Sequence, residues 1–238
     1  MIGTPSPIGI DDWRTALQDA MAPTPSPPPQ ELLRRDLFTP EFFDRCRGAF
    51  QGLTTDAERT AVIAITSPQR REGRSSVAAG LALAIAADTG QRVVLLDLDL
   101  AHASQGRLFG VRCAPGLSDY VAGAPRLRAV ADGDRQLWLL PAGSRGSQAM
   151  LDGSLATGVY GACRERVRWV IADLPPLLDS EETARWCAAA DACLVVGRYR
   201  STTVESLARS ARLLDAGQRA GFLMTADSGL PERIRRWL

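Results

Sequence analysis

Length, composition and charge exclude several classes of protein. The chain has 238 residues, of which 45% are hydrophobic and 23% are charged, and its formal net charge is +1. This balance is typical of a globular domain and provides no bulk positive field to recruit nucleic acid or an anionic membrane. The sequence has neither a run of ~20 apolar residues that could cross a bilayer nor a recognisable secretory signal, so we expect a cytoplasmic protein.

The rare residue types narrow the chemistry further. All 28 basic residues are arginine, so any mechanism that needs a lysine of this chain is excluded. The single histidine, His102, argues against histidine-based triads and metal sites. The five cysteines are scattered and form no C-x-x-C pair, which argues against a zinc ribbon or a disulfide scaffold.

Residues 1–30 are predicted to be a short helix followed by a linker. Apolar side chains recur every three or four residues over 8–21, which indicates one amphipathic helix. These positions are Ile10, Trp13, Leu17 and Met21. The proline-rich stretch at 22–30 indicates a semi-rigid linker. The helix could dock in a groove of a partner protein or fold back onto its own domain, and the sequence leaves both open.

Residues 31–238 are predicted to form one α/β domain. After helical segments that reach residue 53, continuous apolar runs alternate with helical patterns. Strands are expected at 61–65, 92–99, 136–143, 167–176, 191–197 and 220–225, and helices at 73–90, 147–164, 180–190 and 202–217. Apolar strands joined by crossover helices indicate a mostly parallel sheet flanked by helices on both faces. Ligands of such sheets bind at the carboxyl ends of the strands.

The segment after the first strand has the context of a phosphate-binding loop. Residues 66–76 read TSPQRREGRSS and run directly into a helix. The usual pattern is G-x-x-x-x-G-K-[ST], whose backbone N–H groups cradle phosphates. Gly73 matches the second glycine and Ser75 the hydroxyl that binds Mg²⁺, but Pro68 and Arg74 replace the first glycine and the lysine.

Acidic residues end two of the expected strands. Asp97 and Asp99 close the second strand, and Asp173 closes the fourth. A buried strand that ends in carboxylates is costly unless they hold a cation or accept hydrogen bonds. Since the carboxyl ends of parallel strands meet at one edge, we expect these acids to face the loop after the first strand.

From about Glu41 to Thr225 the chain resembles the deviant-Walker P-loop ATPases of the MinD/ParA class. Within that class it is similar to the cytoplasmic domain of bacterial tyrosine kinases of capsule and exopolysaccharide synthesis. The resemblance is carried by TSPQRREGRSS (66–76), VVLLDLDLAHA (93–103), GRLFGVRCAPGLSDYVAG (106–123) and VIADLPPLLD (170–179). The third block has no generic structural reason to match, and it favours the kinases over MinD and ParA.

The resemblance implies a P-loop NTPase-like fold and a nucleotide site. Asp97 and Asp99 would be the catalytic acids. Ser75, Asp97 and Asp173 would hold Mg²⁺. The residues that would bind the phosphates of ATP or ADP are Glu72, Gly73, Arg74, Ser75 and Ser76.

The resemblance also implies a setting for the protein. Its partner would be a membrane protein that determines polysaccharide chain length, a copolymerase, which would recruit the chain to the inner face of the membrane. The oligomer motif E-x-x-R-x-x-R is only partly present, with Glu41, Asp44 and Arg47, and this leaves homo-oligomerisation open. No nucleic-acid partner is expected.

Several positions depart from the kinase pattern. Arg74 replaces the phosphate lysine, and Arg70 and Arg71 replace a proline–glycine pair. Gly80 and Thr225 stand where asparagines are usual, and the tyrosine-rich tail is missing. The losses fall on groups that would contact the phosphates and the base and on the phosphoacceptor, whereas the acidic motifs remain.

We therefore expect a tyrosine-kinase-like regulator or scaffold of exopolysaccharide or capsule biosynthesis and export, in which catalysis is weakened or lost. One alternative is an active tyrosine kinase or ATPase that acts with the membrane partner. A second alternative is a positioning ATPase of the MinD/ParA kind.

Overall fold

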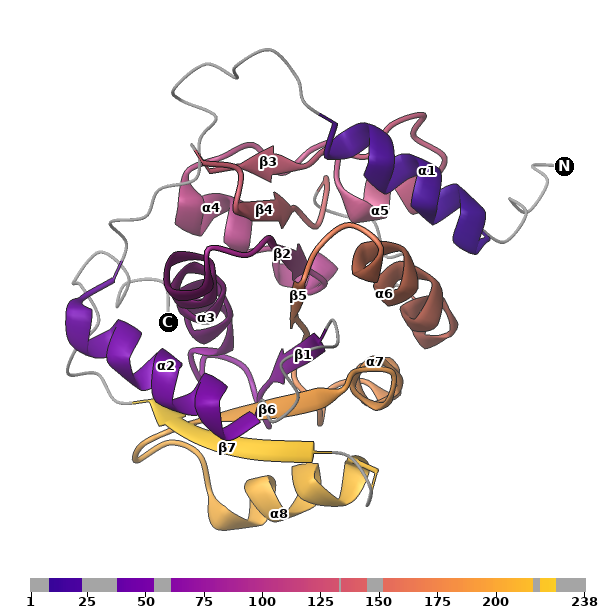
Figure 1. The fold of residues 1–238 in the computed structure, drawn as a ribbon. Coiled ribbons are helices and arrows are strands. Elements are labelled where there is room, and N and C mark those ends of the chain that lie inside the picture. Colours follow the sequence, from indigo (N-terminus) through magenta and orange to yellow (C-terminus); the bar gives the residue numbers. More distant parts are fainter. Residues whose placement is uncertain are drawn as a thin grey trace, which may run out of the picture.

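The computed structural model describes residues 9–22, 38–53, 61–132, 134–144, 152–215 and 219–225. In this described part, seven strands form one sheet in the order β3-β4-β2-β5-β1-β6-β7 (Figure 1). The strands are β1 (Ala61–Thr66), β2 (Val93–Asp97), β3 (Val130–Ala131), β4 (Leu137–Leu140), β5 (Trp169–Asp173), β6 (Ala192–Arg198) and β7 (Arg219–Thr225). Every neighbouring pair is parallel except β3 with β4, which confirms the mostly parallel sheet.

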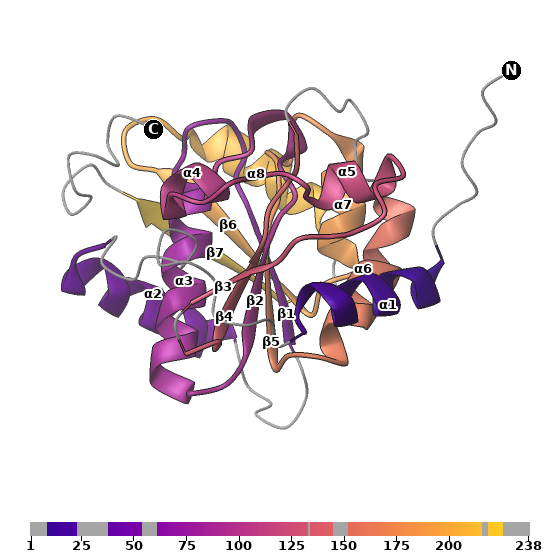
Figure 2. The same ribbon diagram turned by 90° about the horizontal axis from the view of Figure 1, so that it is seen from above.

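Helices cover both faces of this sheet, as Figure 2 shows from above. The α-helices are α1 (Ile10–Ala20), α2 (Pro40–Leu53), α3 (Arg74–Thr89), α4 (Gln105–Phe109), α5 (Leu117–Val121), α6 (Ala156–Arg164), α7 (Glu181–Ala188) and α8 (Val204–Leu213). Two short 3₁₀ turns are η2 (Leu100–His102) and η3 (Gly153–Leu155). One core lies between the sheet and α2 and α3, and the other lies beneath α1, α6 and α7.

The central strands form because their sequences are apolar without alternation. All five residues of β2, VVLLD, are buried, and so are all five of β5, WVIAD. A strand buried on both faces gains from apolar side chains on either side, and this favours a parallel sheet beneath two helical layers. The charged residue at the end of each run is thereby carried to the carboxyl edge of the sheet.

Some expected boundaries were wrong. The strands expected at 136–143 and 167–176 are shorter, as β4 and β5, because Pro141 directly follows the first and Pro175 and Pro176 come soon after the second. The helix expected from 147 begins at Ala156, after η3, and residues 145–151 lie outside the described part. The short antiparallel strand β3 was missed, since two residues carry no periodic pattern.

Helix α1 folds back onto the body of its own chain. Trp13 is 1% exposed, and its ring lies 5.1 Å from that of Tyr120, centroid to centroid. Arg14 Nε donates to Glu165 Oε1 of the segment after α6 at 2.7 Å, and Arg166 donates to Gln18 at 2.9 Å. Of the two interpretations that the sequence left open, the structure supports the intramolecular one. The proposed division at residue 30 falls outside the described residues and stays a prediction.

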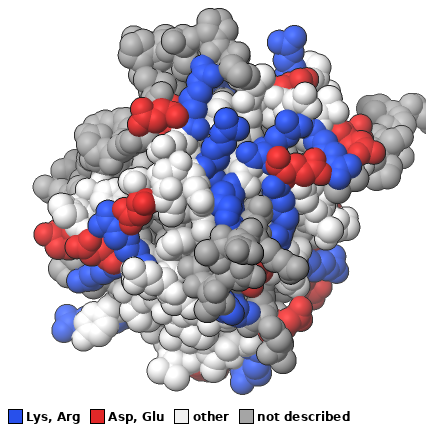
Figure 3. Space-filling model, in the orientation of Figure 1, with Lys and Arg blue, Asp and Glu red and all other residues white. Residues whose placement is uncertain are grey.

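The surface carries both signs of charge side by side. Figure 3 shows arginine side chains gathered over the middle of one face, with acidic side chains next to several of them. Exposed ion pairs include Arg47 with Asp88 at 2.6 Å and Arg164 with Asp191 at 2.8 Å. Among the described residues, no helix is both long and apolar enough to cross a membrane.

Candidate functional site

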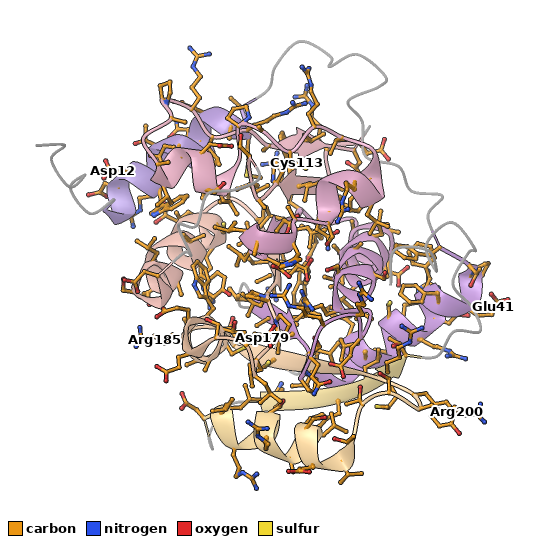
Figure 4. All side chains as sticks on the ribbon, turned by 180° about the vertical axis from the view of Figure 1, so that it is seen from behind. Asp12, Glu41, Cys113, Asp179, Arg185 and Arg200 are labelled. Atoms are coloured by element: carbon orange, nitrogen blue, oxygen red, sulfur yellow. The ribbon has the colours of Figure 1, made fainter. Side chains whose placement is uncertain are left out.

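The predicted site residues meet at the carboxyl edge of the sheet. The parallel register places Asp97 of β2 directly opposite Asp173 of β5, and β5 also pairs with β1. The loop after β1 is tied to the segment after β5, because Leu177 N donates to Ser67 O at 2.8 Å. Figure 4 views the molecule from behind: Asp179, which follows β5, lies near the middle, and Arg200 projects outward at the border.

The loop from β1 to α3 is held by side chains of the chain itself. Glu72 is buried, and its carboxylate accepts hydrogen bonds from Gln69 N at 2.7 Å and from the Thr202 hydroxyl. Two residues adopt left-handed backbone conformations, Arg71 at φ 64° and Gly73 at φ 90°. Residues other than glycine rarely adopt such a φ. Arg71, which stands where the kinase pattern has glycine, therefore holds an unfavourable backbone conformation.

Thr225 closes the other side of this loop. Its hydroxyl donates to Glu72 O at 2.9 Å and lies 3.2 Å from Gly197 O. A Cβ added to Gly73 would approach the Thr225 methyl to 3.3 Å. The threonine that replaces the expected base-reading asparagine therefore packs against the loop and bonds to the backbone. Helix α3 begins at Arg74, and Ser75 and Ser76 lie in its first turn, where free N–H groups favour anions.

The side chain of Arg74 is turned into the site. It is 8% exposed, and its guanidinium forms an ion pair with Asp99, whose side chain is 2% exposed. Its Nη1 lies 3.4 Å from Ser67 Oγ. The group that stands in place of the phosphate lysine is thus engaged by an acid of the second motif.

A second set of charges lies at the rim of the site. Arg70 donates to Asp179 at 3.0 Å and lies 2.6 Å from His102 Nε2. His102 Nδ1 is 3.7 Å from the Asp99 carboxylate. Arg70, Asp179 and His102 are 39–57% exposed, so the contacts among them contribute little free energy.

Asp97 and Asp173 are fully buried, and each keeps one oxygen without a hydrogen bond. Asp97 Oδ2 accepts from the N–H groups of Ser104 and Gln105 at 3.1 and 3.0 Å. The Oδ1 atoms of both aspartates have no partner in the described part of the chain. Burial, and then the charge of Asp173, raise the pKa of Asp97 well above its usual range. Burial raises the pKa of Asp173 to about 6, although the Arg74 charge and hydrogen bonds from Gln105 and Ser75 oppose the rise.

Gln105, the first residue of α4, was not predicted from the sequence. Its side chain is buried, and Nε2 donates to Asp173 Oδ2 at 2.7 Å and to Ser75 O at 2.9 Å. A glutamine in a loop region belongs to no motif that could have singled it out. Its role follows only from the folding of α4 over the ends of β2 and β5.

The residues fit an Mg²⁺–nucleotide only in part. The two unpartnered carboxylate oxygens and Ser75 are the oxygen ligands that Mg²⁺ prefers. However, within the described ranges, no three His, Cys, Asp or Glu side chains are grouped so as to hold a metal ion. Asp99 is engaged by Arg74, whose side chain points at that acid. The carboxylate side of the site suits a cation, whereas the phosphate side does not suit a nucleotide as it stands.

Comparison with known proteins identifies similar sequences. No family model matches the chain. It is 29% identical over 180 residues to “Putative tyrosine-protein kinase EpsB” of Ralstonia solanacearum, covering 71% of this chain and 23% of that protein. It is 28% identical over 169 residues to “Putative tyrosine-protein kinase in cps region” of Klebsiella pneumoniae, covering 66% and 22%. The chain thus matches less than a quarter of the length of either relative.

A further relative is not described as a kinase. The antiactivator FleN of Pseudomonas aeruginosa is 40% identical over 91 residues, which are 38% of this chain and 32% of that protein.

Solved structures show the same fold. The kinase domain of the Escherichia coli tyrosine kinase ETK superposes with a TM-score of 0.66 at 24% identity, covering 76% of this chain and 74% of that one. MinD of Pyrococcus horikoshii, solved with Mg-ADP, gives a TM-score of 0.60 at 19% identity, covering 74% and 76%. The chain therefore has the P-loop fold shared by the MinD/ParA ATPases and the bacterial tyrosine kinases, and its sequence resembles putative tyrosine-protein kinases, one of them in a cps region.

Proposed function

We propose that this chain is a regulator or scaffold of exopolysaccharide or capsule biosynthesis and export that has kept a tyrosine-kinase fold while its catalysis is weakened or lost. The sequence relatives support the setting. The partner would be a membrane protein that sets polysaccharide chain length and draws the chain to the inner face of the membrane.

One observation carries the catalytic part of the proposal. The Arg74 guanidinium is buried against Asp99 rather than free to meet phosphates. Lysine is a compact point charge, and arginine is a bulkier planar fork, so the two do not replace each other in a tight loop. A nucleotide would have to break a buried ion pair before it could gain this charge. Phosphoryl transfer depends on the positioning of the phosphates and the neutralisation of their charge, and an Arg74 side chain held by Asp99 would weaken both.

The active-enzyme alternative keeps one observation in its favour. Asp97 and Asp173 are present and buried, and each has one oxygen without a hydrogen-bond partner among the described residues. The positioning-ATPase alternative rests on the fold that the chain shares with MinD, a septum site-determining protein. It is less favoured by the kinase-like block at 106–123.

Binding of ATP and ADP, measured by calorimetry with and without Mg²⁺, tests the proposal. We expect no detectable heat from the wild-type protein at millimolar nucleotide. Arg74→Lys should gain Mg²⁺-dependent binding, because lysine can leave Asp99 and extend toward the phosphates. Arg45→Lys, on the exposed face of α2, is the matched control and should bind no more than wild type.

The same measurement can contradict the proposal. Micromolar binding by the wild-type protein that requires Mg²⁺ and is lost in Asp97→Ala would establish a working nucleotide site. The proposal of lost catalysis would then be abandoned in favour of an active kinase or ATPase.

A further inference from the structure

The buried polar contacts of the site extend beyond the Arg74–Asp99 pair. Gln105 contacts three elements at this edge. Its side-chain nitrogen donates to Asp173 Oδ2 at 2.7 Å and to Ser75 O at 2.9 Å, while its backbone N–H donates to Asp97 Oδ2 at 3.0 Å. One residue therefore joins β2, β5 and the first turn of α3.

Three aspartates are buried here, and each is compensated in its own way. Asp99 is paired with the Arg74 guanidinium, and Asp97 accepts two backbone N–H groups. Asp173 Oδ2 accepts the Gln105 amide. Carboxylates removed from water are costly without such partners. If Mg²⁺ and its waters were bound, they would contact the carboxylate oxygens that these side chains contact here.

We propose that the Arg74 guanidinium and the Gln105 carboxamide together act as an internal replacement for the cation, and that they hold this edge of the sheet assembled without a ligand. The inference deepens the proposed function and rests on it for the nature of the site. It assigns Gln105 a positioning role: the amide occupies Asp173 Oδ2, so Mg²⁺ that takes this oxygen must displace the amide, just as a nucleotide must displace Arg74 from Asp99.

The local geometry explains why the amide stays in place. The backbone N–H groups of Ser104 and Gln105 anchor the start of α4 on Asp97, so the Gln105 side chain begins from a fixed point. Gly106, the next residue, cannot carry a Cβ without colliding with Cys113 Sγ, so α4 is packed closely on its other side as well. Gln105 Oε1 has no partner among the described residues, so its donor contacts account for the orientation.

The first test is thermal unfolding in the absence of nucleotide, with and without Mg²⁺. Gln105→Ala should lower Tm by roughly 4–8 °C, the size expected from the loss of two buried hydrogen bonds in a chain of this length. Millimolar Mg²⁺ should restore much of the loss, because Asp97 and Asp173 then face an open space. Wild type and the control Gln51→Ala, exposed on α2, should not respond to Mg²⁺. Equal responses of wild type and Gln105→Ala, or none in either, would overturn the inference.

A double-mutant cycle keeps the inference testable if the alanine variant folds poorly. Gln105→Met has a similar volume but no donor, so it removes the hydrogen bonds without opening a cavity. It should lower Tm strongly when residue 173 is aspartate and much less in an Asp173→Asn background, where no charge needs compensation. Equal losses in both backgrounds would show that the amide does not act on the Asp173 charge, and would overturn the inference.

Failure of this inference can be distinguished from failure of the proposed function. Tight ATP binding by wild type would contradict the proposal of lost catalysis. The inference about Gln105 would then stand or fall on the Mg²⁺ response of Gln105→Ala. An unresponsive Gln105→Ala would end this inference and leave the proposed function standing.

Discussion

At the scale of single residues, the state of the site is decided by a buried ion pair. Arg74 and Asp99 are almost inaccessible to water, and each compensates the charge of the other. Removal of one partner from such a pair leaves the other charge buried and uncompensated, which costs far more than the pair contributes. The arginine at the lysine position is therefore part of the folded structure and is not a passive replacement on the surface.

Asp99→Asn tests this view. The substitution keeps the size of the side chain and removes its charge, so the Arg74 guanidinium is left buried without a counter-charge. We expect the free energy of unfolding in urea to fall by about 3–5 kcal/mol. Asp179→Asn removes a more exposed partner of Arg70 and should cost about 0–1 kcal/mol. Similar losses in both variants would mean that the Arg74–Asp99 pair is effectively solvated.

At the scale of elements, a glycine allows α2 and α3 to pack closely. A Cβ at Gly80 of α3 would collide with the Phe42 ring of α2 and would approach Cys46 Sγ to 3.1 Å. The departure from the kinase asparagine at this position therefore has a structural cause. The glycine admits the Phe42 ring, and Cys46 and Leu53 of α2 are buried at the same core.

A pair of glycine variants checks the helix contact. Gly80→Ala should lower the free energy of unfolding by about 1–3 kcal/mol, because the added methyl forces Phe42 or α2 to move. Gly48→Ala lies within α2, where the added Cβ meets nothing within 4 Å, and alanine should stabilise the helix by about 0.5–1 kcal/mol. Stabilisation by both substitutions would contradict the close packing of α2 on α3.

At the scale of the whole molecule, helix α1 packs on the face of the sheet opposite to the one that α2 covers. Helix α1 lies with α6 on one face, whereas α2, the next described helix, lies on the other (Figure 2). Trp13 and Leu17 are buried in the same core as α6 and α7. This helix therefore contributes to the stability of the domain.

Trp13→Ala measures that contribution. Loss of a buried indole should lower the free energy of unfolding by about 3–5 kcal/mol, in a single transition if α1 and the sheet unfold together. Asp19→Ala, on the exposed side of α1, is the control and should change stability by less than about 0.5 kcal/mol. A Trp13→Ala protein as stable as wild type would indicate that α1 is dispensable in solution.

Much of the architecture could be predicted from the sequence because it depends on local patterns. Apolar runs that end in Asp97 and Asp173 must be buried strands with acids at one edge, and the loop before Arg74 must open toward that edge. Parallel pairing then places the two aspartates opposite each other, as the register of β2 and β5 confirms.

The polar contacts inside the site could be identified only from the tertiary structure. The sequence shows that Arg74 replaces a lysine, but not that its side chain pairs with Asp99, 25 residues away. It gives no sign that Gln105 reaches Asp173 or that α1 packs beside α6, because neither contact follows a periodic pattern. Strand and helix periods are fixed by the backbone within a few residues, so sequence alone determines them. The partner of a buried polar side chain is fixed by which distant elements fold over it, so only the tertiary structure determines that.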